Sequence, residues 1–216
     1  MNSIKLAGKI ICIGGYSGSG KSTAIGHMRR YMSNTAFITS RGDIRTIHDP
    51  QKLEEEFGIP VDTNHIFDYF KKVICLNAGI DELSFYENLT YQKMFSKLIS
   101  DYIEKQYEQA CSEILRSDTP DFIIMEWSTI PSFKIWMSSD YRVMIQPINM
   151  ELLYSNLIRR SYQNRRKLTL DAAKMRNLSI MDIVENANNV TIQLINDYSS
   201  AYEQAVKKFC FGLMRT

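Results

Sequence analysis

Short apolar runs alternate with longer amphipathic segments along this chain. The runs are rich in β-branched residues and have the length of buried strands. They cover residues 9–13, 36–39, 121–126 and 141–146. Strands that alternate with helices are typical of a parallel sheet with helices on both faces. We therefore expect an α/β fold in which ligands bind at the carboxyl ends of the strands.

The segments between these runs carry apolar residues at helical spacing. They predict helices at residues 22–31, about 51–57, about 63–76 and about 90–116, from Asn149 to Arg160, at about 171–176 and at 190–209. A further short strand is expected near Ile183. Neither an internal repeat nor a low-complexity linker interrupts the pattern, so residues 1–216 are expected to form a single domain.

A glycine-rich stretch follows the first expected strand. Gly15, Tyr16, Ser17, Gly18, Ser19, Gly20, Lys21 and Ser22 fit the pattern G-x-x-x-x-G-K-[ST], and Thr23 continues into the expected helix. Glycines let backbone N–H groups converge on phosphate oxygens, and the helix N-terminus adds the positive end of its dipole. In such a loop Lys21 reaches the β- and γ-phosphates, and the Ser22 hydroxyl binds Mg²⁺. Within its strand–loop–helix context, the pattern predicts a nucleoside triphosphate site rather than a chance glycine-rich turn.

Two acidic residues follow expected strands, where phosphoryl transfer needs carboxylates. Asp43 comes shortly after the second strand and is a candidate base for a substrate hydroxyl, although it equally suits a turn or a helix cap before Ile44. Glu126 ends an apolar run, and a glutamate is rarely buried without a partner. We predict that Glu126 holds Mg²⁺ or its waters, with a structural ion pair as the alternative.

A basic run lies between the helices expected near residues 160 and 171. It contains Arg159, Arg160, Arg165, Arg166 and Lys167. The fork of an arginine matches phosphate oxygens, whereas a run of charges otherwise serves as a solvated helix face or as a nucleic-acid patch. The phosphate loop favours the first interpretation, and Arg160 is the strongest candidate of the run.

Charge and cysteine content narrow the expected partners and compartment. The 26 basic and 24 acidic residues leave a net charge of +2, which favours neither a nucleic-acid nor a membrane partner. The four cysteines are dispersed, without a C-x-x-C pair, which favours a reducing compartment. The first residues lack the layout of a signal peptide, and no apolar run has the length of a membrane span. We expect a cytoplasmic protein that binds a small molecule.

Several segments together resemble the dephospho-coenzyme A kinase family. The phosphate loop matches closely, although other kinases share it. Arg41-Gly42-Asp43-Ile44 is similar to the family's D-x-D-I-I, with Arg41 in place of the first acidic residue. Residues 54–58 resemble a helix that ends in Phe-Gly, and Glu126 stands where the family has an Asp closing its third strand.

Later segments extend the resemblance. Glu151 and Arg160 match residues that open the family's lid-bearing helix and its lid, and Asp140 matches an Asp before the fourth strand. Residues 182–186 resemble D-x-V-I-D-N, which would place Asn186 near the adenine-binding loop. The family's P-L-L-F-E and His-Pro motifs are absent, and these differences fall in the parts that contact the substrate.

The resemblance implies a P-loop NTPase fold with a parallel five-stranded sheet. It also implies a helical substrate-binding insertion at about 44–116 and an arginine-bearing lid at about 159–177. Such an enzyme would use ATP and Mg²⁺ to phosphorylate the ribose 3′-hydroxyl of dephospho-coenzyme A. Asp43 would be the general base, while Lys21 and Arg160 would neutralise the γ-phosphoryl group.

Two alternatives to this activity remain. The first is a nucleoside or nucleotide kinase, because the glycine loop also resembles that of uridine kinases. In addition, Glu126-Trp127-Ser128 loosely resembles the Glu-Arg-Ser of deoxynucleoside kinases. The second is a nucleotide-binding regulator with weak turnover, which the missing P-L-L-F-E motif would suit.

Overall fold

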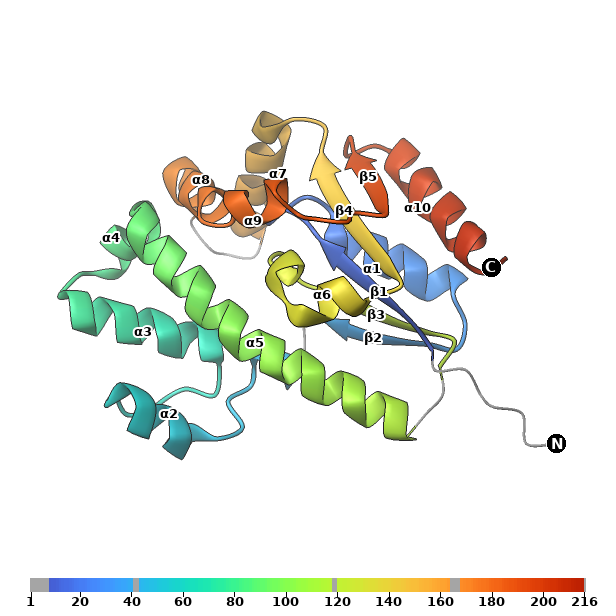
Figure 1. Cartoon of the computed structure of the whole chain (residues 1–216). Coiled ribbons are helices and arrows are strands. Elements are labelled where there is room, and N and C mark those ends of the chain that lie inside the picture. The colour runs from blue at the N-terminus through green and yellow to red at the C-terminus, as the bar shows by residue number, and fades with distance from the viewer. Residues whose placement is uncertain (1–7, 41–42, 118–119, 164–167, 216) are drawn as a thin grey trace.

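A single five-stranded sheet forms the centre of the molecule (Figure 1). The computed structural model describes residues 8–40, 43–117, 120–163 and 168–215, with only the backbone of Asp43. The strands are β1 (Lys9–Gly14), β2 (Thr35–Thr39), β3 (Phe122–Glu126), β4 (Tyr141–Pro147) and β5 (Ile192–Asn196). All neighbouring strands are parallel and their order is β2-β3-β1-β4-β5, so the expected α/β fold is confirmed.

Helices cover both faces of this sheet. Ile11 and Ile13 of β1 are fully buried in a core that includes residues of α1 (Lys21–Tyr31) and α10 (Ser200–Leu213). Cys12, which points to the opposite face, belongs to a second core that includes residues of α5 (Leu89–Ser117). A strand with buried residues on both faces reads as a continuous apolar run, which explains the sequence pattern at residues 9–13.

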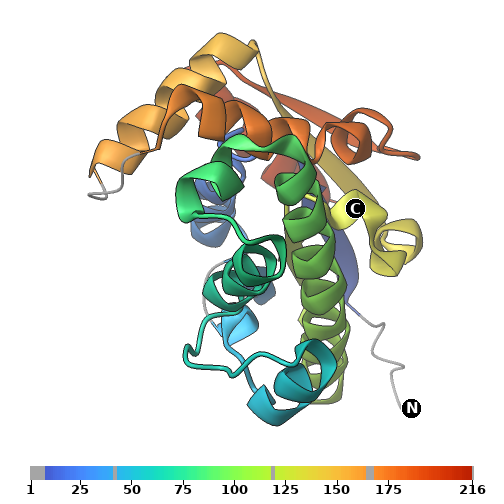
Figure 2. The same cartoon turned by 90° about the vertical axis from the view of Figure 1, so that its left-hand side faces the viewer.

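The chain between β2 and β3 is helical. It comprises η1 (Asp43–Arg45), α2 (Pro50–Phe57), α3 (Ile66–Ala78), α4 (Glu82–Glu87) and α5. These helices extend to one side of the sheet, and α5 runs back across its face (Figures 1 and 2). The fully buried Tyr69 of α3 donates a hydrogen bond from its hydroxyl to the carbonyls of Leu53 and Ile59, which fixes α2 against α3.

The remaining helices flank β4 in sequence. Before it stand η2 (Ile130–Ser132) and α6 (Lys134–Ser138), and after it α7 (Met150–Gln163), α8 (Leu170–Leu178) and α9 (Met181–Glu185). Helix α8 contacts α4 and α5, so the segment after β4 meets the helical segment between β2 and β3 (Figure 2). The hydroxyls of Ser96 and Ser179 share a hydrogen bond of 2.9 Å at this contact.

Two predicted elements near the C-terminus are wrong. Residues 190–209 do not form one helix, because Ile192–Asn196 pairs with β4 as an edge strand and α10 begins only at Ser200. Ile183 lies in α9 and not in a strand. Among the described residues, no helix combines the length and apolar composition needed to cross a bilayer.

Candidate active site

The glycine-rich loop joins the end of β1 to the start of α1 and has a conformation that requires glycine. Gly15, Gly18 and Gly20 have φ angles of +133°, +91° and +100°. A side chain at any of them would also collide with a neighbour: at Gly18, a Cβ would lie 2.7 Å from Cγ of Leu157. Both restrictions explain why these three positions of the motif cannot carry a larger residue.

The loop carbonyls from Gly15 to Gly20 all accept hydrogen bonds from side chains. Nζ of Lys21 donates to the carbonyl oxygens of Gly15 at 2.9 Å and Tyr16 at 2.8 Å. The next four carbonyls each accept a hydrogen bond from a distant side chain: Ser17 from Asn177, Gly18 from Tyr198, Ser19 from Asn196 and Gly20 from Tyr202. With these carbonyls held by side chains, the N–H groups of the first turn of α1 can be presented to an anion.

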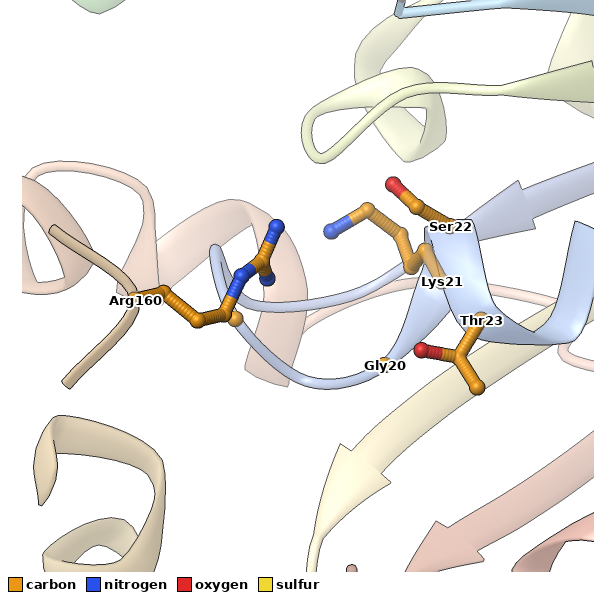
Figure 3. Close-up of a pocket in the computed structure, with 6 residues that line it drawn as sticks. Gly20, Lys21, Ser22, Thr23 and Arg160 are labelled. Atoms are coloured by element: carbon orange, nitrogen blue, oxygen red, sulfur yellow. The ribbon is translucent and has the colours of Figure 1, made fainter. Parts of the chain in front are cut away.

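A hollow of about 250 Å³ opens over this loop. It is lined by Gly18, Gly20, Lys21, Ser22, Thr23 and Arg160. The side chains of Lys21 and Arg160 point toward one another across it, from α1 and α7 (Figure 3). The structure thus brings together the phosphate-loop residues and the lid arginine that the sequence predicted.

The surroundings of Lys21 disfavour its charged form. The side chain is only 6% exposed, and its pKa is lowered from 10.5 to about 8, mainly by burial. Glu126 opposes this shift, while Arg176 and Arg160 contribute to it. Several cations therefore act on Lys21, and a polyphosphate at the hollow is the type of ligand that would balance them.

Arg176 acts on the site through its charge, and the sequence did not single it out. It lies on α8, within the range of the predicted lid, and it acts electrostatically on Lys21 as Arg160 does. Nothing in its local sequence separates it from a solvated helix arginine. Only the packing of α8 against the phosphate loop reveals its position.

Glu126 ends β3 beside the phosphate loop. Its position in the sheet is opposite Ile13 of β1 and Thr39 of β2. The side chain is 2% exposed, and Oε2 accepts hydrogen bonds from the N–H and the hydroxyl of Ser40, at 3.2 and 2.8 Å. Its buried carboxylate therefore has a polar partner in β2's carboxyl-terminal loop, and its role toward a metal stays a prediction.

These residues fit ATP and Mg²⁺. A cradle that a Cβ would fill, a buried lysine and two arginines suit a triphosphate. Mg²⁺ usually retains waters and binds one or two protein oxygens plus substrate phosphates. The Ser22 hydroxyl at the hollow and the Glu126 carboxylate would supply such oxygens.

Three residues of the loop, Tyr16, Ser17 and Ser19, do not line the hollow and make hydrogen bonds within the protein. Tyr16 is buried and donates its hydroxyl to Oε1 of Glu185 at 2.8 Å, which together with burial raises the tyrosine pKa. The N–H of Ser17 donates to Asn177, and the fully buried Ser19 donates its N–H to Tyr16. The role of these three residues in nucleotide binding stays a prediction.

Asn186 caps the C-terminus of α9, and its predicted place near adenine stays a prediction. The last residue of β5, Asn196, is 3% exposed and donates from Nδ2 to the Ser19 carbonyl. Asn196 thus contacts the phosphate loop, although the sequence did not single it out.

Some predicted residues lie outside the described part of the chain. These are Arg41, Arg165, Arg166, Lys167 and the side chain of Asp43. The backbone of Asp43 begins η1, shortly after the carboxyl end of β2. Arg159 is exposed and donates to Oδ1 of Asn156 at 2.8 Å, which agrees with a solvated helix face.

The fold is similar to that of the crystal structure of TT1252 from Thermus thermophilus. The TM-score is 0.64, with 14% sequence identity over 97% of this chain and 99% of that one. A shikimate kinase from Bacteroides thetaiotaomicron aligns at 13% identity over 96% of this chain and 99% of its own, with a TM-score of 0.47. A dephospho-CoA kinase from Campylobacter jejuni aligns at 16% over 95% and 97%, with a TM-score of 0.49.

These likenesses define the fold and not the activity. At TM-scores below 0.5, neither kinase indicates a function for this chain. No protein-family model matches the sequence, and neither does a curated protein. The TT1252 alignment covers nearly all of both chains, so the whole chain shares one α/β architecture with that protein.

Proposed function

We propose that this protein is an ATP-dependent kinase that phosphorylates a small molecule. The observation that carries the proposal is the phosphate loop itself, whose carbonyls are held by side chains beside a hollow lined by Lys21 and Arg160. Backbone N–H groups at a helix N-terminus, together with two cations, are suited to the charge of a transferred phosphoryl group.

The residues of the chain would divide the work of phosphoryl transfer. Bound ATP would supply the phosphoryl group, and Mg²⁺ would balance part of its charge. Lys21 and Arg160 would hold the γ-phosphate from opposite sides of the hollow (Figure 3). Ser22 and Glu126 would hold the metal or its waters. Asp43 would orient the acceptor hydroxyl and take its proton.

Dephospho-coenzyme A is the first acceptor to test. Support comes from the phosphate loop, from the segments around Asp43, Glu126 and Arg160, and from the resemblance of residues 182–186. A ribose or deoxyribose of a nucleoside or nucleotide is the alternative acceptor. A regulator that binds nucleotide with weak turnover is the alternative outside the enzymes.

Incubation with candidate acceptors, beginning with dephospho-coenzyme A, separates these three functions. The protein is mixed with Mg-ATP and dephospho-coenzyme A, and both ADP and coenzyme A are followed by mass spectrometry, with Lys21→Ala as the control. Equal amounts of both products, absent from the control, would support the proposed acceptor. If no coenzyme A appears, a panel of nucleosides and nucleotides follows. ATP binding without phosphorylation of any acceptor would contradict the kinase proposal and favour the regulator.

A further inference from the structure

Asn177 of α8 binds the backbone N–H and carbonyl of Ser17 with the two ends of its carboxamide. Oδ1 accepts the N–H of Ser17 at 2.9 Å, and Nδ2 donates to the Ser17 carbonyl at 3.3 Å. Nδ2 also contacts the carbonyl of Ala173, one helical turn earlier, at 3.4 Å. The side chain is fully buried, so all its polar atoms are used on backbone groups.

The stability of α8 alone does not explain a buried asparagine at position 177. Asparagine favours helix interiors less than leucine does, and burying its amide is unfavourable unless every hydrogen bond is made. A leucine of similar size would fill the site but would leave two polar groups of Ser17 without a partner. The amide therefore serves the loop more than the helix that carries it.

The same contact joins two parts of the candidate active site. Ser17 immediately precedes Gly18, the first of the hollow-lining residues, and Asn177 immediately follows Arg176. Leu157 of α7 packs against Gly18 from the other predicted lid helix. Helices α7 and α8, which carry the two arginines, are thus seated directly on the phosphate loop.

We propose that Asn177 is a positioning residue for triphosphate binding. By clamping the backbone of Ser17, its carboxamide holds the loop in the conformation that presents N–H groups to the phosphates, and it fixes Arg176 beside Lys21. The proposal rests on the proposed function, because it assumes that the loop binds ATP. It adds a residue that lies 160 positions from the loop and outside the phosphate-loop motif.

Asn177→Asp gives a test that can be reversed by pH. The ionised carboxyl can accept the Ser17 N–H but cannot donate to the Ser17 carbonyl, whereas the protonated carboxyl can do both. Burial raises the pKa of a carboxyl group, so protonation is expected within an accessible range. ATP affinity is measured by calorimetry from about pH 5.5 to about pH 8.5, as the ratio of variant to wild-type Kd.

The ratio removes the titration of groups that the substitution does not perturb. The charged groups that the structure describes near the loop include Lys21, Glu126, Arg160, Arg176, Asp182 and Glu185, and these are present in both proteins. The titration of ATP itself also cancels. We expect Asn177→Asp to bind ATP at least about tenfold more weakly than wild type at the high-pH end, and the ratio to fall toward 1 at the low-pH end.

Gln92→Glu is the matched control. Gln92 is also buried, at 4% exposure, and donates from Nε2 to the carbonyl of Phe85 at 3.0 Å, in helices away from the phosphate loop. This variant places a similar carboxyl against a carbonyl without touching the loop. Its thermal stability should fall with rising pH, while its ATP affinity should follow wild type.

Each outcome decides the proposal. Equal Kd values for Asn177→Asp and wild type at every pH would overturn it, and so would the same loss of affinity in Gln92→Glu. If Asn177→Asp does not fold at high pH, Asn177→Ala is measured instead, with the same tenfold loss expected and wild-type affinity overturning the proposal. Failure of wild type to bind ATP would instead reject the proposed function.

Discussion

The burial of Lys21 predicts a specific dependence of stability on pH. Its pKa is lowered from 10.5 to about 8, mainly by burial, with Glu126 opposing the shift and Arg176 and Arg160 adding to it. A difference of about 2.5 in pKa corresponds to ~3 kcal/mol between the protonated and neutral forms of the folded protein. Replacing Lys21 by methionine removes this titration while retaining most of the side-chain volume.

The direction of this pH dependence follows from the number of protons bound by the folded and unfolded chains. Because the folded pKa lies below the unfolded value, the unfolded chain binds more protons than the folded chain between pH 8 and 10.5. Wild type should therefore gain stability relative to Lys21→Met as pH rises through this window, by up to ~3 kcal/mol. Below about pH 8 the difference should be constant, since Lys21 is protonated in both states.

Urea unfolding of both proteins at a series of pH values measures the difference directly. Lys208→Met, which removes an exposed lysine of α10, controls for the loss of a lysine as such. The hydrogen bonds of Lys21 to Gly15 and Tyr16 change the difference by a fixed amount and not its slope. A wild-type to Lys21→Met difference that stays flat from pH 7.5 to 10 would refute the electrostatic account of this site.

The remaining predictions concern the loop, the lid and the base. Gly18→Ala should weaken ATP binding by at least about tenfold, because φ is +91° and Leu157 blocks the Cβ; calorimetry measures this, and an ATP affinity equal to that of wild type would contradict it. Gly26→Ala, which has open space around it in α1, should raise the free energy of unfolding by about 0.5–1 kcal/mol, as measured by urea unfolding. Arg160→Ala should lower kcat by about 10- to 1,000-fold with a smaller change in ADP affinity, because its charge would act mainly on the transferred group; loss of affinity without loss of kcat would count against this. Asp43→Asn should cut turnover strongly and leave ATP affinity near wild type, and unchanged turnover would remove it from the mechanism.

The phosphate loop could be predicted from the sequence because its information is local. A β-branched run, a glycine pattern and a helix-forming segment lie within about two dozen residues, and each positive φ has its own glycine. Glu126 was also recognisable, since a carboxylate that ends an apolar run needs a partner, which Ser40 provides.

The C-terminal strand could not be assigned in the same way. Residues 192–196 are short and apolar enough to fit either a helix or a strand, and their strand conformation depends on pairing with β4, about 50 residues earlier. The local signal for a break was present in Ser199, which caps α10 by accepting the N–H of Ala201. Without this break, the helix predicted at residues 190–209 extends back over the strand.

No local sequence pattern predicts the side chains that bind the loop carbonyls. Asn177, Asn196, Tyr198 and Tyr202 lie 160 to 182 positions from the carbonyls they bind. In sequence they are ordinary helix and turn residues. Burial explains why they matter, because a carbonyl removed from water needs a donor.

The central claim is that the loop from Gly15 to Thr23 binds ATP through its phosphates. Calorimetric titration of wild type and Lys21→Ala with Mg-ATP, ADP and adenosine tests it most directly. We predict that wild type binds ATP and ADP far more tightly than adenosine, and that Lys21→Ala loses most of this preference because the loop then lacks the cation for the β- and γ-phosphates. Equal binding of ATP and adenosine, or an unchanged preference in Lys21→Ala, would contradict the account.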